Sequence, residues 1–113
     1  MDGVSVAKIA KKMELKNFIE EIDLKEKRIL LSDVNRPALQ LSGYFEYFDP
    51  SRVEIIGMVE YAYLQKKTEE ERQKIYDEFL SYDIPCVIFC REFEPDAKFL
   101  ETAKNNGVPV LGT

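Results

Sequence analysis

The stretch Ile84-Pro85-Cys86-Val87-Ile88-Phe89 decides the fold, because it is an apolar run with almost no polar interruption. A strand with one face in water alternates apolar and polar residues, whereas a strand covered on both faces reads as a continuous apolar run. Strands of the second kind are typical of parallel sheets that carry helices. The run therefore predicts an interior strand of an α/β domain.

Strand and helix patterns alternate upstream of this run. Residues 53–57 are predicted to be a strand that ends in Gly57, and residues 58–65 are predicted to be helical. Thr68 and Glu71 have the spacing of a capping box, in which each side chain satisfies a backbone N–H at the start of a helix. The apolar face of that helix consists of Ile75, Tyr76, Phe79 and Leu80.

The alternation continues downstream. Glu94-Pro95 begins another helix, Gly107 lies just past its end, and residues 108–111 are predicted to be a final strand. This order of elements predicts an α/β fold with helices packed on a largely parallel sheet. The length of 113 residues suits one domain, so residues 1–113 are predicted to fold as a single unit.

The first third of the chain gives a weaker pattern. Ser5 is predicted to cap a helix, and residues 28–31 are predicted to be a strand. The apolar face of the capped helix consists of Val6, Ala10 and Met13. Apolar residues within residues 15–22 fall at helical spacing, but a short strand fits the same segment, so periodicity leaves both assignments open.

The segment from Pro37 to Phe48 is predicted to be a buried helix. Pro37 suits the first turn of a helix, where a missing N–H is harmless, and Asn35 or Arg36 would precede that turn. Gly43 weakens a helix interior by about 1 kcal/mol relative to alanine. Apolar residues recur at three- and four-residue intervals, namely Ala38, Leu41, Tyr44, Phe45 and Phe48. Only the Asn35-Arg36 start is expected to be exposed.

Composition argues against several classes of function. The net charge is −5, whereas a nucleic-acid-binding protein normally carries a net basic surface. No apolar run is long enough to span a membrane and no signal peptide opens the chain, so we expect a cytoplasmic protein. Histidine is absent, which removes the commonest general base and metal ligand. Cys86 and Cys90 would lie about 13 Å apart along a strand, too far for a disulfide, and are interpreted as small apolar residues.

The residues predict no catalytic, cofactor-binding or metal-binding set. Residues 107–113 have the glycine spacing of a phosphate-binding P-loop but lack its lysine. Glu60 follows Gly57 at the carboxyl end of a predicted strand, where open α/β sheets often bind ligands, although an exposed helix charge explains it as well. Asn35, Arg36, Gly57 and Glu60 are therefore the candidate ligand or partner contacts, with Arg36 able to pair with an anionic metabolite.

Four stretches resemble the N-terminal domain of bacterial HPr kinase/phosphorylase. The longest runs from Asn35 to Phe48, and residues 52–60, 84–89 and 106–111 follow with matching order and spacing. Ala38 departs from the family, which usually has glycine there. The resemblance implies a three-layer α/β/α fold with a mixed, roughly five-stranded sheet, similar to the uridine-nucleotide-binding domain of the Mur ligases. It also implies that residues 15–22 include a strand.

The resemblance implies a role as part of a larger enzyme. The family's enzyme phosphorylates a serine of the phosphocarrier HPr with ATP or pyrophosphate and Mg²⁺, reverses this by phosphorolysis, and governs carbon catabolite regulation. Its P-loop and catalytic aspartate belong to a C-terminal kinase domain, which this chain does not include, and the full protein assembles as a hexamer. No residue here matches that machinery, so the chain itself is expected to be non-catalytic and to need no cofactor.

Three hypotheses follow for the chain. The first is a regulatory or scaffolding domain of HPr kinase/phosphorylase. The second is a free-standing sensor of a nucleotide or phosphorylated metabolite at the four candidate contacts. The third is a self-association module with an exposed tyrosine at the interface, for which the candidates are Tyr47, Tyr61 and Tyr63.

Overall fold

A mixed sheet of five strands forms the centre of the computed structural model, which describes residues 3–30 and 33–113. The strand order is β2-β7-β6-β5-β4, in which β4 to β7 run parallel and β2 runs antiparallel to β7. The strands are β2 (Lys16–Asn17), β4 (Val34–Asn35), β5 (Val53–Ile56), β6 (Val87–Phe89) and β7 (Val110–Gly112). The α/β prediction with a mixed five-stranded sheet is confirmed.

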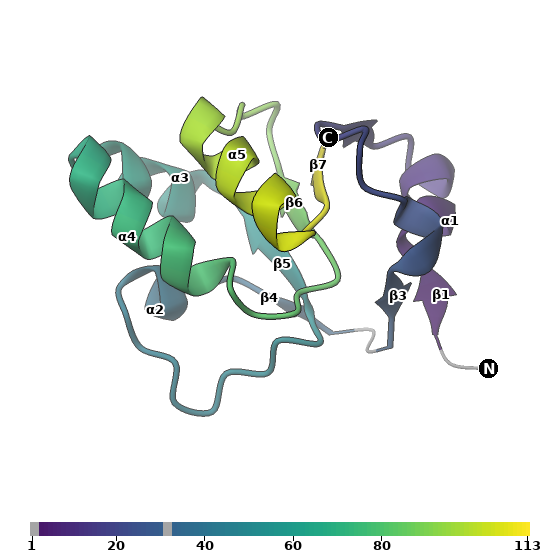
Figure 1. The fold of residues 1–113 in the computed structure, drawn as a ribbon, viewed down its shortest axis with the longest axis horizontal. Coiled ribbons are helices and arrows are strands. Elements are labelled where there is room, and N and C mark those ends of the chain that lie inside the picture. Colours follow the sequence, from purple (N-terminus) through teal and green to yellow (C-terminus); the bar gives the residue numbers. More distant parts are fainter. Residues whose placement is uncertain (1–2, 31–32) are drawn as a thin grey trace.

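Helices cover both faces of this sheet (Figure 1). One face carries α2 (Ala38–Leu41), α3 (Met58–Gln65), α4 (Glu69–Phe79) and α5 (Ala97–Asn106). The other face carries a small N-terminal unit, made of β1 (Val4–Ser5), α1 (Val6–Lys12), the 3-10 turn η1 (Leu24–Glu26) and β3 (Arg28–Ile29). In this unit β1 and β3 pair antiparallel.

The continuous apolar run in β6 follows from these two layers. Val87 and Phe89 belong to the core beneath α3, α4 and α5, whereas Ile88 belongs to the core beneath α1. Because successive side chains of a strand point to opposite faces, a strand with a core on each side needs an apolar residue at every position.

Several helix ends agree with the sequence predictions. The Ser5 side chain accepts a hydrogen bond from the Lys8 N–H, and Thr68 and Glu71 form the reciprocal capping box. Gly107 ends α5 at a φ of 71°, in the left-handed region that favours glycine. The segment 15–22, which periodicity left open, contains the strand β2 that the family resemblance implied.

The predicted helix over residues 37–48 is mostly wrong. The helix α2 comprises only Ala38–Leu41, and Asn35 lies in β4 rather than at a helix cap. Gly43 has a φ of 100°, a left-handed conformation that an α-helix cannot continue through. Beyond it the chain follows an irregular course in which Phe45 stacks on Tyr82 at 4.9 Å between ring centroids. Tyr44 is therefore 45% exposed rather than part of a packing stripe.

Smaller differences occur near the N-terminal unit. Met13 is 61% exposed rather than buried, because α1 ends one residue earlier and Met13 lies at its C-cap. The predicted strand over residues 28–31 corresponds to β3, but Leu31 lies outside the described residues. Cys86 and Cys90 are both free thiols, of which Cys86 is buried and Cys90 is half-buried. Within the described part of the chain, no helix has the length and apolar character needed to cross a bilayer.

Candidate functional site

The carboxyl ends of β4 and β5 bring three of the four candidate residues together. Arg36 follows β4 directly, Gly57 follows β5, and Glu60 lies in the first turn of α3. Since β4 and β5 are parallel neighbours, their carboxyl ends lie at the same edge of the sheet. The structure therefore places Arg36, Gly57 and Glu60 in direct contact, as expected for residues at a shared strand edge.

A single carboxylate oxygen organises this cluster. Glu60 Oε1 accepts hydrogen bonds from Arg36 Nη2 at 2.8 Å, from Arg36 Nε at 3.2 Å and from the Gly57 N–H at 2.9 Å. The Glu60 side chain is 3% exposed, whereas the Arg36 side chain is 52% exposed. Glu60 is therefore a buried anchor and not the exposed helix charge that an acidic residue at this position often represents.

Gly57 provides the space that this contact needs. A Cβ atom on Gly57 would lie 2.5 Å from Arg36 Nη2, closer than non-bonded atoms approach. The φ of Gly57 is −103°, a value open to any residue, so a side chain here would displace the Arg36 guanidinium and would not strain the backbone.

The ion pair between Arg36 and Glu60, called the clamp below, connects the end of β4 to α3. Burial acts to raise the pKa of Glu60, but the hydrogen bonds from Arg36 and the Gly57 N–H outweigh it and hold the pKa below its ordinary value. The same partnership raises the pKa of Arg36. An anionic ligand at Arg36 would have to share a guanidinium that already has a buried carboxylate partner. Ligand binding at the four candidate contacts stays a prediction.

Asn35, the fourth candidate, points to a different cluster. Its Nδ2 donates to Glu54 Oε1 at 2.7 Å and to Gln40 Oε1 at 3.0 Å, while Gln40 Nε2 donates to the Tyr44 carbonyl at 3.3 Å. Glu54 is fully buried, and burial raises its pKa to about 7. Sequence reasoning missed Glu54 and Gln40. The available signal was a charged residue inside the short apolar strand β5, where an unpaired charge is costly.

Replacing Arg36 with methionine is expected to lower the free energy of unfolding at pH 7 by about 1–2 kcal/mol, because Glu60 then loses its charged partner. The folded-state pKa of Glu60 is depressed, so its stabilising contribution is present above the ordinary pKa and is lost as the pH falls. The loss should therefore be smaller at pH 3 than at pH 7, as measured by urea denaturation.

The matched control for this prediction is Arg91→Met, which changes an exposed arginine just beyond β6. This control should change stability by about 0.5 kcal/mol or less, as is usual for surface positions. Equal losses for Arg36→Met at both pH values would show that the clamp is not the source of the stabilisation.

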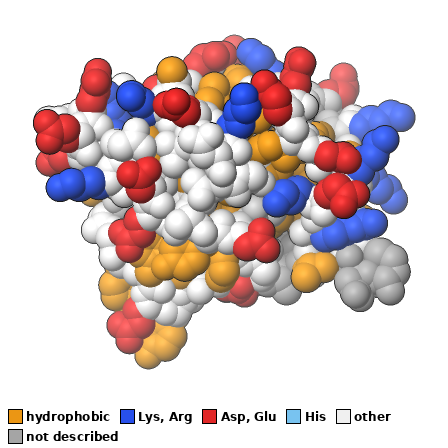
Figure 2. Space-filling view, viewed as in Figure 1, with side chains coloured by type: hydrophobic (Ala, Val, Ile, Leu, Met, Phe, Trp, Pro, Cys, Tyr) orange, Lys and Arg blue, Asp and Glu red, His pale blue; other side chains and the backbone are white. Residues whose placement is uncertain are grey.

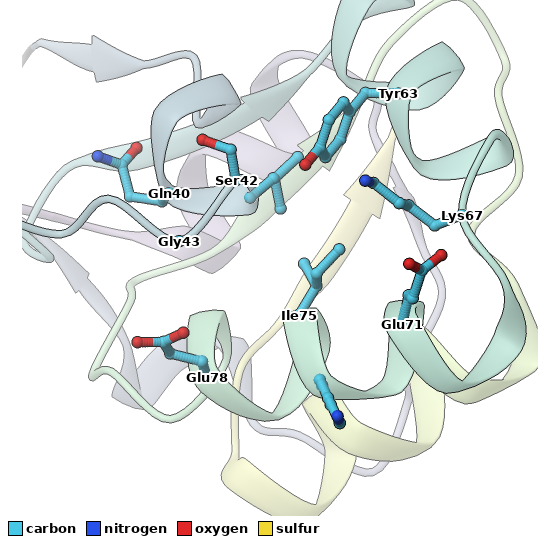
Figure 3. Close-up of a pocket in the computed structure, with 10 residues that line it drawn as sticks. Gln40, Ser42, Gly43, Tyr63, Lys67, Glu71, Ile75 and Glu78 are labelled. Atoms are coloured by element: carbon cyan, nitrogen blue, oxygen red, sulfur yellow. The ribbon is translucent and has the colours of Figure 1, made fainter.

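A pocket of about 260 Å³ lies beside α2, between α3 and α4. Figure 3 shows Tyr63, Lys67, Glu71 and Ile75 lining this space across from Ser42 and Gly43. Its volume is below the usual range for small-molecule pockets, and Lys67 and Lys74 are balanced by Glu71 and Glu78. The pocket thus selects no ligand by charge, although Gln40 connects it to the Glu54 cluster.

The three tyrosines considered for self-association differ in exposure. Tyr61 stacks on Phe93 at 4.4 Å between ring centroids, and Tyr63 lies beneath the Lys67 ammonium. Tyr47 is 91% exposed and has a left-handed φ of 64°. Figure 2 shows hydrophobic side chains gathered at the lower left of the molecule, where Figure 1 places the segment between α2 and β5 that contains Tyr47. Only Tyr47 has the exposure that a contact tyrosine needs, and self-association stays a prediction.

Comparison with known proteins identifies the family of this chain. The family described as "HPr Serine kinase N terminus" matches residues 4–113. The chain belongs to the HPr serine kinase N-terminal family. An HPr kinase/phosphorylase of Lachnoclostridium phytofermentans is 46% identical over 113 residues, which is the whole of this chain and 37% of that protein. One of Latilactobacillus sakei is 38% identical over 112 residues, which is 99% of this chain and 36% of that protein.

These relatives are much longer than this HPr serine kinase N-terminal chain, which spans little more than a third of the length of the curated relatives it matches. The fold is also similar to the regulatory region of a Clostridium perfringens pyrophosphatase, whose CBS and DRTGG domains were solved with diadenosine tetraphosphate. That match has a TM-score of 0.61 and covers 97% of this chain and 41% of the other. At 19% identity it shows a shared fold and no more.

Proposed function

We propose that this chain is the non-catalytic N-terminal domain of an HPr kinase/phosphorylase, with a regulatory or scaffolding role. The observation that carries the proposal is the coverage of the family match. Residues 4–113 match the family, yet the same alignment accounts for only 36–37% of relatives named HPr kinase/phosphorylase. A matching segment of this length has the size expected of one domain within a larger enzyme.

In this proposal the chemistry belongs to a C-terminal kinase domain. That domain would carry the P-loop and the catalytic aspartate, and would bind ATP or pyrophosphate with Mg²⁺. The whole enzyme would phosphorylate a serine of HPr and remove the phosphate by phosphorolysis, in the cytoplasm, as part of carbon catabolite regulation. The sequence supports this division because it contains no histidine and because its P-loop-like spacing at residues 107–113 lacks the lysine.

We extend the proposal to the fold class and the assembly. The mixed sheet with helices on both faces supports the likeness to the nucleotide-binding domain of the Mur ligases, without implying that this chain binds a nucleotide. Homo-oligomerisation is proposed for the whole enzyme, mostly through its C-terminal domain.

A phosphotransfer assay on this chain alone tests the proposal. The chain is incubated with HPr, Mg²⁺ and either ATP or pyrophosphate, and phosphoserine on HPr is measured by mass spectrometry. The full-length Lachnoclostridium phytofermentans relative serves as the positive control. We expect phosphoserine from the control and none above background from the chain; phosphoserine from the chain would overturn the non-catalytic assignment.

A further inference from the structure

Glu54 is a buried carboxyl that the proposed function does not use. The residue is fully buried on β5, and its Oε1 accepts one hydrogen bond, from Asn35 Nδ2 at 2.7 Å. Its Oε2 is also buried and has no hydrogen-bond partner among the described residues. A carboxylate left in this state loses its hydration without compensation, so the neutral acid is favoured over the ion.

The charged and titratable groups around Glu54 do not neutralise it. Arg52, directly before β5, attracts the Glu54 charge and so acts to lower its pKa. The Arg52 Nε is itself buried and has no hydrogen-bond partner among the described residues. Asp49, in the turn before β5, disfavours its charge. The Cys86 thiol, before β6, stays neutral, because burial and the nearby Glu54 raise its pKa to about 12. Among the residues that the structure describes, the neighbouring elements β4 and α2 contribute the amide side chains of Asn35 and Gln40 and no charged group. Burial therefore dominates and raises the pKa of Glu54 to about 7.

The element next to Glu54 is weakly attached to the sheet. β4 has two residues and lies at the edge of the sheet, and among the described residues it pairs with β5 alone. The register places Asn35 directly beside Glu54, so the side chain that holds Glu54 belongs to this edge strand. Short edge pairings of this kind open at low free-energy cost compared with the centre of a sheet.

A chain of hydrogen bonds continues from Glu54 toward the surface. Asn35 Nδ2 joins Glu54 to Gln40, and Gln40 Nε2 donates to the backbone carbonyl of Tyr44. Tyr44 begins the irregular segment that carries the exposed Tyr47. Three hydrogen bonds thus connect Glu54 to α2 and to the irregular segment after Gly43.

We propose that Glu54 is a proton-operated latch, which holds β4 and α2 on the sheet while it is protonated and releases them when it ionises. Ionisation places an uncompensated charge among β4, α2 and β5, and opening of that edge lets water reach the carboxylate. Because Gln40 also lines the pocket beside α2, opening changes that pocket together with the surface around Tyr44. This inference goes beyond the proposed function and does not rest on it.

Amide hydrogen exchange of the whole chain, followed by NMR between pH 6 and pH 8, tests the latch. The reporters are the N–H groups of Leu41 and Tyr44, which donate to the carbonyls of Pro37 and Leu39. The reference is the Leu100 N–H in α5, which donates to the Asp96 carbonyl. Rates are divided by the intrinsic exchange rate at each pH, so that only the opening equilibrium remains.

We expect the protection of Leu41 and Tyr44 to fall about tenfold from pH 6 to pH 8, because the closed form binds the proton about 2.5 pH units more tightly than the open form. The protection factor of Leu100 should stay above those of Leu41 and Tyr44 at both pH values. Glu54→Gln cannot ionise and should keep the protection of Leu41 and Tyr44 constant. Glu101→Gln, which removes an exposed carboxyl from α5, should behave as the wild type does.

Three outcomes would overturn the latch. Unchanged protection of Leu41 and Tyr44 in the wild type would show that ionisation does not open this edge. Protection factors for Leu41 and Tyr44 that equal that of Leu100 at both pH values would show that these amides exchange only through unfolding of the whole domain, and not through a local opening. A tenfold fall that persists in Glu54→Gln would assign the pH response to another group.

Discussion

Replacing Phe89 with alanine is expected to lower the free energy of unfolding by about 3–5 kcal/mol, the usual cost of removing a large buried aromatic side chain. Phe89 is 2% exposed and lies on the interior strand β6. Its ring packs in T-shaped geometry against the rings of Phe99 and Tyr61, with centroid distances of 5.0 Å and 6.4 Å. Alanine would leave a cavity between these rings that rigid helices cannot fill.

The effect is large compared with the whole stability of a domain, which is typically about 5–15 kcal/mol. Urea denaturation followed by circular dichroism measures it. Tyr47→Ala is the matched control, since it truncates an aromatic residue that is 91% exposed and should change stability by about 0.5 kcal/mol or less. Similar losses for the two variants would contradict the placement of the core beneath α3 and α5.

Replacing Glu54 with glutamine is expected to stabilise the domain at pH 8 by about 3 kcal/mol. The folded-state pKa of Glu54 is raised from 4.5 to about 7, so the folded state binds the proton more tightly than the unfolded state does. Stability from this group is therefore fully present below about pH 4.5 and is lost as the pH rises through 7. A shift of about 2.5 pH units corresponds to about 3 kcal/mol.

The stabilisation by Glu54→Gln should disappear near pH 4.5, where the wild-type carboxyl is protonated in the folded state. Urea denaturation at pH 4.5 and pH 8 measures both values, with Glu101→Gln as the control that shows little difference at either pH. A Glu54→Gln variant that is less stable than the wild type at pH 8 would show that the carboxylate is stabilising in place, contrary to its burial and unpartnered oxygen.

Much of the fold could be predicted from the sequence because its signals are local. The apolar run before Cys90 predicted β6. The Thr68–Glu71 capping box predicted the start of α4, and Gly107 predicted the end of α5. Each depends on residues that are near one another in the chain, so a single sequence is enough to see them.

The segment after Pro37 could not be predicted because tertiary contacts override its helical spacing. Phe45 and Phe48 recur as a helix face would require, yet they pack against Tyr82, which is far away in the sequence. Gly43 was a sign of this break, since its left-handed φ ends any helix, but a glycine inside a helical pattern also occurs in real helices.

The candidate site was predicted only in part. Sequence reasoning placed Gly57 and Glu60 at the carboxyl end of a strand and Arg36 at the start of a helix. The structure brings these residues together, but periodicity gave no sign that Glu60 is a buried partner of Arg36. Asn35 was placed at the start of a helix and not in a strand, so its pairing with Glu54 on the neighbouring strand could not be foreseen. Strand register is a property of two segments, and one segment alone does not reveal it.

The central claim, that this chain supports a kinase without taking part in its chemistry, is tested most directly on the Lachnoclostridium phytofermentans relative. That enzyme is assayed with and without the segment that aligns with residues 1–113. Phosphorylation and dephosphorylation of HPr are measured for both forms, and circular dichroism establishes that each form is folded. We predict that the shortened enzyme still transfers phosphate in both directions, with altered rates or assembly. A folded but inactive shortened enzyme that regains activity when the 113-residue chain is added would contradict the claim, because this chain would then supply a group that the reaction requires.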